Sequence, residues 1–224
     1  PRVTITTPAS GNSSSSTQNF NATVLEPNPE TSGTLQLTPT GQSATNYTLT
    51  NRSGNWGYTN LSVPDNSYTA KFHINDSYGQ MNNSQSVTFT VDTTRPAVLN
   101  ASVNDTSVSS TQIIQINVSV TDANRDDGSV NVSGNSGATN ISMTLVAGTA
   151  SIFQAATSSS SLGCGSDGSC TLTFAAKDAA GNLNASVTTT ITVDGLSPRV
   201  TINTPASGNS SSPTQNFNAT VLEQ

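Results

Sequence analysis

The chain has 224 residues, which is enough for one large domain or two modest ones. Only 9% of the residues are charged, the formal net charge is −6, and 35 Ser and 35 Thr make up nearly a third of the chain. The acidic balance excludes a basic surface for nucleic acid, and the lack of any long apolar run excludes a membrane span in this segment.

Short strands are predicted along the chain because apolar residues alternate with Asn, Ser and Thr. Thr fills many outward positions, where its branched β-carbon favours extended backbone. No window of ten or more residues has a helical period, so the expected fold class is all-β. The alternation with period two is clear in Phe20/Ala22/Val24, Tyr68/Ala70/Phe72/Ile74, Val87/Phe89/Val91, Ile116/Val118/Val120 and Ile141/Met143/Leu145.

Turn sequences separate these runs. About seven short strands in roughly 100 residues indicate an immunoglobulin-like β-sandwich. The turns are expected at Arg52-Ser53-Gly54-Asn55, Pro64-Asp65-Asn66, Tyr78-Gly79, Asp127-Gly128 and Ala180-Gly181-Asn182.

The first 27 residues recur at 198–224 with 24 identities, so the sequence repeats with a period of 197 residues. Inside each period a weaker repeat is present, because eleven residues between Phe72 and Val98 reappear 102 positions later. We therefore expect one domain at 1–95, a second at 96–197, and the first two strands of a third at 198–224. Either the array continues covalently into a filament, or 198–224 completes a neighbouring subunit by strand addition, which is a form of self-association.

Three segments resemble the tandem Ig-like repeats of bacterial and archaeal cell-surface proteins. They are Pro1-Arg2-Val3-Thr4-Ile5 through Pro8-Ala9-Ser10-Gly11, the turn Asp178-Ala179-Ala180-Gly181-Asn182, and the joint Phe89-Thr90-Val91-Asp92-Thr93-Thr94-Arg95-Pro96. The resemblance implies an extracellular spacer, adhesin stalk, filament or cell-surface coat, and it implies no single ligand. The alternative is an adhesin module that binds carbohydrate or a partner surface.

N-glycosylation sequons, Asn-x-Ser/Thr, are about twice as frequent as composition alone would supply. Glycans would provide the solubility that so few charges cannot, and bulky groups on exposed strands would block edge-to-edge association. The alternative is that Asn, Ser and Thr are polar filler. The candidate sites are Asn12, Asn21, Asn46, Asn51, Asn60, Asn75, Asn82, Asn100, Asn104, Asn117, Asn131, Asn140, Asn184, Asn209 and Asn218.

Cys164 and Cys170 are the only cysteines, and a disulfide between them is favoured over a metal half-site because no histidine or second cysteine pair lies near. In the 102-residue register Cys170 aligns with Tyr68, which stands where Ig-like domains carry a tyrosine corner. We therefore expect the second domain to replace a tyrosine hydrogen bond with a short covalent link, formed in an oxidising extracellular compartment.

Asp122, Asn124 and Asp126 place oxygen ligands at alternate positions, as the start of a calcium loop does. Asp127 stands where such loops need Gly, so an acidic turn is the favoured interpretation. No other cofactor is expected.

Catalytic residues are scarce. His73 is the only histidine and is expected to face solvent from a strand, and no Gly-x-Ser-x-Gly context is present. Trp56 and Tyr58 could form a sugar-stacking platform, but residues of this kind more often fill a core. The sequence therefore indicates a structural protein and not an enzyme.

Overall fold

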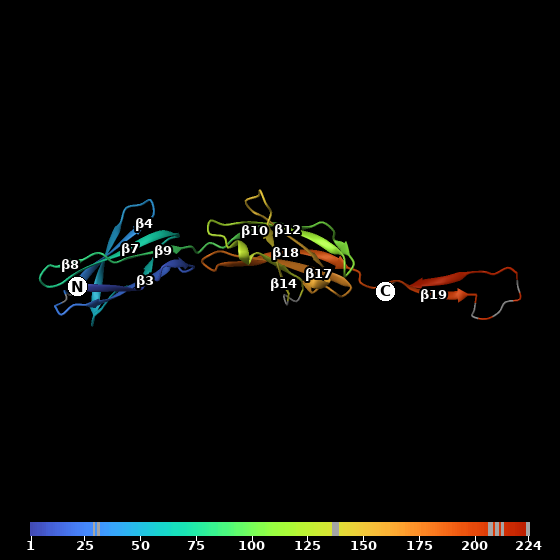
Figure 1. Cartoon of the computed structure of the whole chain (residues 1–224), viewed down its shortest axis with the longest axis horizontal. Helices are drawn as coiled ribbons and strands as arrows, with labels where there is room; N and C mark the ends of the chain where they lie inside the picture. The colour runs from blue at the N-terminus through green and yellow to red at the C-terminus, as the bar shows by residue number, and fades with distance from the viewer. Residues whose placement is uncertain are drawn as a thin grey trace. The chain divides into compact units, whose positions relative to one another are not determined.

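The computed structural model describes residues 1–28, 30, 32–135, 139–205, 208, 211 and 213–222. Within these residues the chain forms twenty strands and two short 3₁₀ helices, and no α-helix is present (Figure 1). The all-β prediction is confirmed. The described part also contains no helix long and apolar enough to cross a membrane. The chain divides into two compact units, of which one comprises 1–98, 120–129 and 175–184, and the other 99–119, 130–174 and 185–224.

Nine strands of the first unit belong to one sheet with the order β1-β3-β6-β5-β4-β7-β9-β2, and β8 pairs with β7. They are β1 (Arg2–Thr7), β2 (Gly11–Ser13), β3 (Thr17–Leu25), β4 (Ser32–Pro39), β5 (Thr45–Arg52), β6 (Asn55–Ser62), β7 (Asn66–Asn75), β8 (Met81–Asn82) and β9 (Ser86–Val91).

This sheet folds into two facing layers because β5 pairs with β4 along one part of its length and with β6 at its end. The two-residue turn between β5 and β6 has positive φ at both Ser53 and Gly54, as a tight hairpin requires. The Phe20 ring on β3 lies 5.8 Å from the Phe89 ring on β9, although these strands are not neighbours in the sheet. The apolar faces of the two layers therefore meet in a common core.

The alternation in the sequence produces this core. Phe20 and Ala22 on β3 are fully buried, and so are Ala70, Phe72 and Ile74 on β7. Since successive strand residues point to opposite faces, the polar residues between them lie on the outer surface. The remaining buried apolar members of the cluster are Val3, Leu35, Leu37, Leu49, Trp56, Val63, Tyr68, Phe89 and Val91.

The later strands form two further sheets, β10-β12-β16-β15 and β11-β18-β17-β13-β14. Their inward residues, such as Ile116, Phe153 and Phe174, are fully buried. The elements are β10 (Ala97–Val103), β11 (Ser107–Val108), β12 (Ile113–Thr121), η1 (Asp127–Ser129), β13 (Asn131–Ser133), β14 (Asn140–Ser142), β15 (Thr144–Leu145), β16 (Ile152–Ser158), η2 (Ser160–Leu162), β17 (Gly168–Lys177) and β18 (Leu183–Val193).

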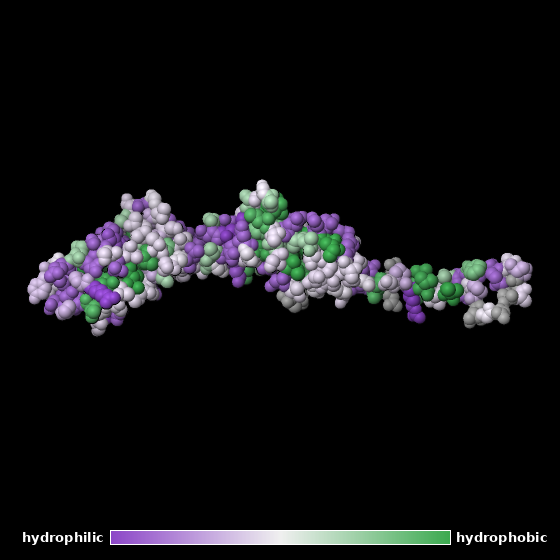
Figure 2. All heavy atoms as spheres, viewed as in Figure 1, coloured by the Kyte–Doolittle hydropathy of each residue, from purple (hydrophilic) through white to green (hydrophobic). Residues whose placement is uncertain are grey.

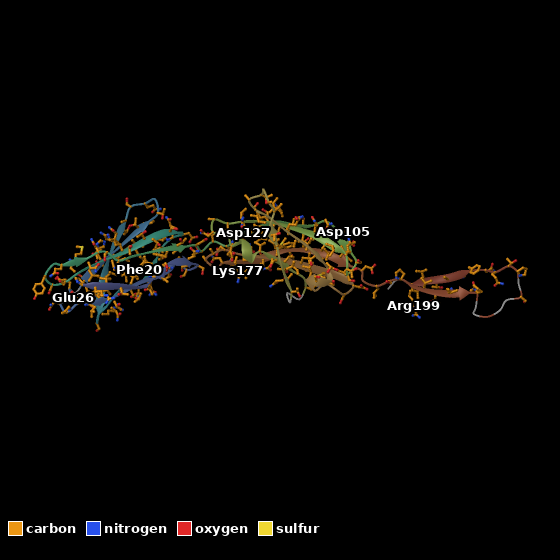
Figure 3. The ribbon with its side chains drawn as sticks, in the orientation of Figure 1. Phe20, Glu26, Asp105, Asp127, Lys177 and Arg199 are labelled. Atoms are coloured by element: carbon orange, nitrogen blue, oxygen red, sulfur yellow. A yellow bond between two sulfur atoms is a disulfide. The ribbon has the colours of Figure 1, made fainter. Side chains whose placement is uncertain are left out.

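The last two strands, β19 (Arg199–Thr204) and β20 (Asn218–Leu222), pair with each other and with no other strand of the described part of the chain (Figure 1). We call them the β19–β20 pair. Arg199 is at its start (Figure 3), and all residues of both strands are exposed. The sequence predicts two strands in this segment as the beginning of a third sandwich.

Candidate functional site

All the described sequon asparagines except Asn104 lie on strands, and half of the described ones are exposed. Each exposed side chain can extend from the surface without displacing a core residue. The exposed sequon asparagines are Asn12, Asn46, Asn60, Asn100, Asn104, Asn140 and Asn218. The half-buried ones are Asn21, Asn51, Asn75, Asn82, Asn117, Asn131 and Asn184. Asn209 lies outside the described residues.

Two exposed sequons have a backbone conformation that asparagine tolerates better than most residues. Asn60 on β6 and Asn100 on β10 have φ of 58° and 53°, in the left-handed region. Neither side chain makes a hydrogen bond to the described part of the chain. Asn104 uses its side-chain oxygen to accept a hydrogen bond from the Gln115 N–H at 2.7 Å, which leaves its amide nitrogen toward solvent.

Some half-buried sequons use the amide nitrogen, the atom that a glycan would modify, as Asn21 does when its Nδ2 donates to the Thr7 hydroxyl at 2.9 Å. Asn82 Nδ2 donates to the Pro1 carbonyl at 2.9 Å, and Asn184 Nδ2 donates to the Pro96 carbonyl at 2.8 Å. The two asparagines are equivalent in the 102-residue repeat. Each ties the last part of its domain to the residue that precedes the first strand, so their role is structural.

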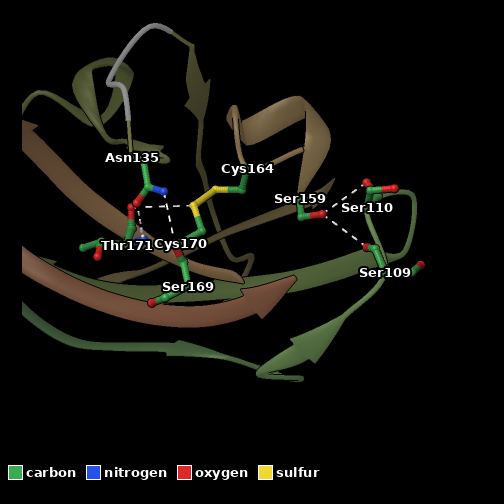
Figure 4. The surroundings of a disulfide bond; sticks show 8 residues. All are labelled: Ser109, Ser110, Asn135, Ser159, Cys164, Ser169, Cys170 and Thr171. Carbon is green, nitrogen blue, oxygen red and sulfur yellow. Dashed lines mark hydrogen bonds between the residues drawn. A yellow bond between two sulfur atoms is a disulfide. The ribbon is translucent and has the colours of Figure 1, made fainter. Parts of the chain in front are cut away.

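A different interaction holds the corner near the start of the long strand in each repeat, at β7 in the first and at β17 in the second. In the first, the Tyr68 hydroxyl donates to the Pro64 carbonyl at 2.6 Å, which is the expected tyrosine corner. In the second, a disulfide joins Cys164 to Cys170, and both cysteines are buried (Figure 4).

The surroundings of the disulfide hold the loop that follows β16. The Asn135 side chain accepts from the Thr171 N–H at 2.6 Å and donates to the Ser169 carbonyl at 3.3 Å (Figure 4). Gly134 passes so close that a β-carbon there would collide with the Cys164 sulfur and the Leu162 carbonyl. The disulfide is therefore packed as part of the domain interior.

Three carboxylates gather in the first unit. Side-chain oxygens of Asp92, Asp122 and Asp178 lie within 4.8 Å of one another, and Asp92 and Asp178 are only 5% and 3% exposed. Asn124 Nδ2 donates to Asp92 at 2.7 Å, and Asn182 Nδ2 donates to Asp178 at the same distance. Of the described acidic residues, these three are close enough to share a cation.

This group differs from the calcium pattern proposed from the sequence. The structure brings Asp122 and Asn124 into it, but Asp126 is not a member and accepts a hydrogen bond from the Gly128 N–H at 3.1 Å, as in an acidic turn. Asp92 follows β9 and Asp178 follows β17, far from the loop in sequence, so loop spacing could not find them. The internal repeat was the one signal that the sequence offered for these two residues. Asp92 has its counterpart at Asp194, and Asp178 has its counterpart at Asp76.

The aromatic and histidine candidates lie mainly inside the first unit. Trp56 is fully buried in the core and cannot stack on a sugar, so the core interpretation of this residue holds. His73 is half-buried, and its Nε2 atom is buried without a hydrogen-bond partner among the described residues. The expectation that His73 faces solvent was therefore too simple.

His73 is expected to make stability depend on pH. Burial, together with the nearby Lys71, lowers the pKa of His73 below its usual value of 6.5. The unfolded chain therefore binds the proton first, and the free energy of unfolding should fall as the pH drops below about 6.5. Denaturation of His73→Gln between pH 7 and 5 should show a shallower dependence than wild type. Equal slopes for the two proteins would contradict this assignment.

Comparison with known proteins supports the fold. No protein-family model and no curated protein sequence matches the chain. A marsupial T cell receptor is similar in structure, with 10% identity and a TM-score of 0.54 over 90% of this chain and 77% of its own. Fibronectin(III)-like modules of CbhA from Clostridium thermocellum are 16% identical, with a TM-score of 0.46 over 86% of this chain and 93% of theirs.

A tetra-tandem repeat from the extending region of a large adhesion protein is 20% identical, with a TM-score of 0.36 over 90% of this chain and 51% of that chain. The match to the T cell receptor, at 10% identity, shows the fold alone. The immunoglobulin-like β-sandwich predicted from the sequence is confirmed.

Proposed function

We propose that this chain is a segment of a structural extracellular protein, in which Ig-like domains follow one another as a spacer, stalk or surface layer. The observation that carries the proposal is the recurrence of residues 1–27 at 198–224 with the same strand pairing. Arg2 pairs with Leu25 in the first copy, and Arg199 pairs with Leu222 in the second. A repeated domain start within one polypeptide is what a tandem array requires.

The spacer function includes N-linked glycans on the exposed sequons. The chain has few charges to keep strand surfaces apart, and sugars on outward side chains would do so. Strand β10 is an edge of its sheet and carries the exposed Asn100. Glycosylation at such a site would shield the unpaired backbone from other molecules.

Glycopeptide mapping of protein from its native source tests this proposal. We expect hexose-containing mass at Asn46, Asn60, Asn100 and Asn140, whose side chains are exposed and make no hydrogen bond to the described residues. We expect Asn82 and Asn184 to be unmodified, because their amide nitrogens are already engaged. An intact mass equal to that of the bare polypeptide would overturn the glycosylation proposal.

The competing function, an adhesin module, needs an exposed aromatic patch free of glycans. Among the described aromatic residues, Tyr78 and Phe217 are largely exposed, at 76% and 82%. Tyr78 lies in the turn between β7 and β8, and Phe217 directly precedes β20, so the two residues belong to segments far apart in the sequence. This distribution favours the spacer.

A further inference from the structure

The β19–β20 pair exposes an apolar surface that a folded domain would cover. Val200, Ile202, Phe217 and Val221 are each at least 60% exposed, and Figure 2 shows hydrophobic residues at this surface. Two strands alone bury too little to be stable in water. A contiguous exposed patch of this kind marks an interaction surface.

The first unit shows how the same residues are covered. Their equivalents Val3 and Phe20 are at most 4% exposed, and the equivalents Ile5 and Val24 are half-buried against the same core. The strand pairing is the same in both copies, including the register shift after Ile5 and its equivalent Ile202. The backbone of the β19–β20 pair is therefore already in the form that the first unit uses.

The cover in the first unit comes from the strands that follow along the chain. We call residues 32–91, which contain β4 to β9, the acceptor segment. Its strand β6 hydrogen-bonds to the free edge of β3, with Trp56 opposite Ala22 and Tyr58 opposite Phe20. Its strand β9 contributes Phe89, whose ring packs against Phe20. In the β19–β20 pair the matching edge of β20 has no partner strand among the described residues.

We propose that the β19–β20 pair docks onto a second copy of the acceptor segment located downstream in the same polypeptide. The inference rests on the proposed tandem array, and it adds the register in which β20 pairs with its neighbouring strand. β20 pairs with the strand equivalent to β6, so Ala219 lies opposite the second copy of Trp56, and Asn218 lies opposite the second copy of Gly57. Phe217 enters the core between the two layers.

The acceptor segment of the same copy is not the partner, because it is already occupied. Its site holds β1 and β3, which match β19 and β20 in sequence and pairing. If β19 and β20 replaced β1 and β3 in this site, one apolar surface would become buried and an equal one would become exposed. Between two molecules this exchange also costs association entropy, so it gives no net stabilisation.

The test extends the chain by a second copy of residues 28–95 placed after Gln224. Amide hydrogen exchange of residues 218–222 is measured in the 224-residue chain and in the extended chain. We expect exchange to slow by at least about 100-fold in the extended chain, because opening then requires unfolding of the completed sandwich. Phe217→Ser should abolish this protection in the extended chain and change nothing in the shorter one.

A control chain joins the second 28–95 copy directly to residue 197, so that the β19–β20 pair is missing. Its second acceptor segment should remain unfolded. Folding of that segment without the β19–β20 pair, or fast exchange of 218–222 in the extended chain, would overturn the inference. So would concentration-dependent protection in the 224-residue chain, because it would assign the partner to another molecule. None of these results depends on whether native material is glycosylated or fibrous, so the inference and the proposed function can fail separately.

Discussion

Replacing Phe20 by Ala should lower the free energy of unfolding of the first unit by about 3–5 kcal/mol, whereas Phe217→Ala should change stability by less than about 0.5 kcal/mol. The two residues occupy the same position of the 197-residue repeat. Phe20 is fully buried between the layers, and Phe217 is 82% exposed. Removing Phe20 therefore leaves a cavity, and removing Phe217 leaves none.

Chemical denaturation of the two variants, followed by the fluorescence of Trp56, measures this difference. Trp56 is the only tryptophan and lies in the same core as Phe20, so it reports on the affected unit. Equal loss of stability in the two variants would show that Phe217 is also packed in this chain. That result would contradict the structure of the β19–β20 pair.

Removing the disulfide with Cys164→Ala and Cys170→Ala together should destabilise the second sandwich by about 2 kcal/mol. The two cysteines are six residues apart, so the loop is short and its closure restricts the unfolded chain only modestly. The matched change in the first sandwich is Tyr68→Phe, which removes the hydrogen bond to Pro64 and should cost about 1 kcal/mol.

Thermal or chemical unfolding with and without a reducing agent checks the disulfide prediction. Reductant should weaken the wild-type protein and leave the double variant unchanged. If reductant has no effect on the wild type, the link does not contribute to stability. The aligned positions of Tyr68 and Cys170 would then serve unrelated purposes.

Much of the fold could be predicted because its causes are local. The alternation around Phe20 and Ala22 predicts which face of the strand is buried. The 102-residue register that aligns Tyr68 with Cys170 predicts where each domain has its corner. The burial of the His73 Nε2 atom was missed, because burial at the side of a strand depends on which residues lie on neighbouring strands.

The candidate sites also include features that the sequence predicts and features that depend on tertiary contacts. Sequons are read directly from the sequence, but the hydrogen bonds that engage Asn82 and Asn184 arise only when the ends of a domain meet. The acidic group of Asp92, Asp122 and Asp178 likewise joins residues from three separate parts of the chain. Spacing within one loop suggested Asp126 instead, because it carries no information about tertiary neighbours.

Electron microscopy of native material tests the central claim, a continuing array of Ig-like domains, most directly. The long strands β7 and β17 contain ten residues, which corresponds to about 33 Å per domain. With two domains in each 197-residue period, domains placed end to end predict long fibres with an axial repeat near 70 Å. Compact particles without a fibre, or fibres whose repeat is unrelated to this spacing, would contradict the claim.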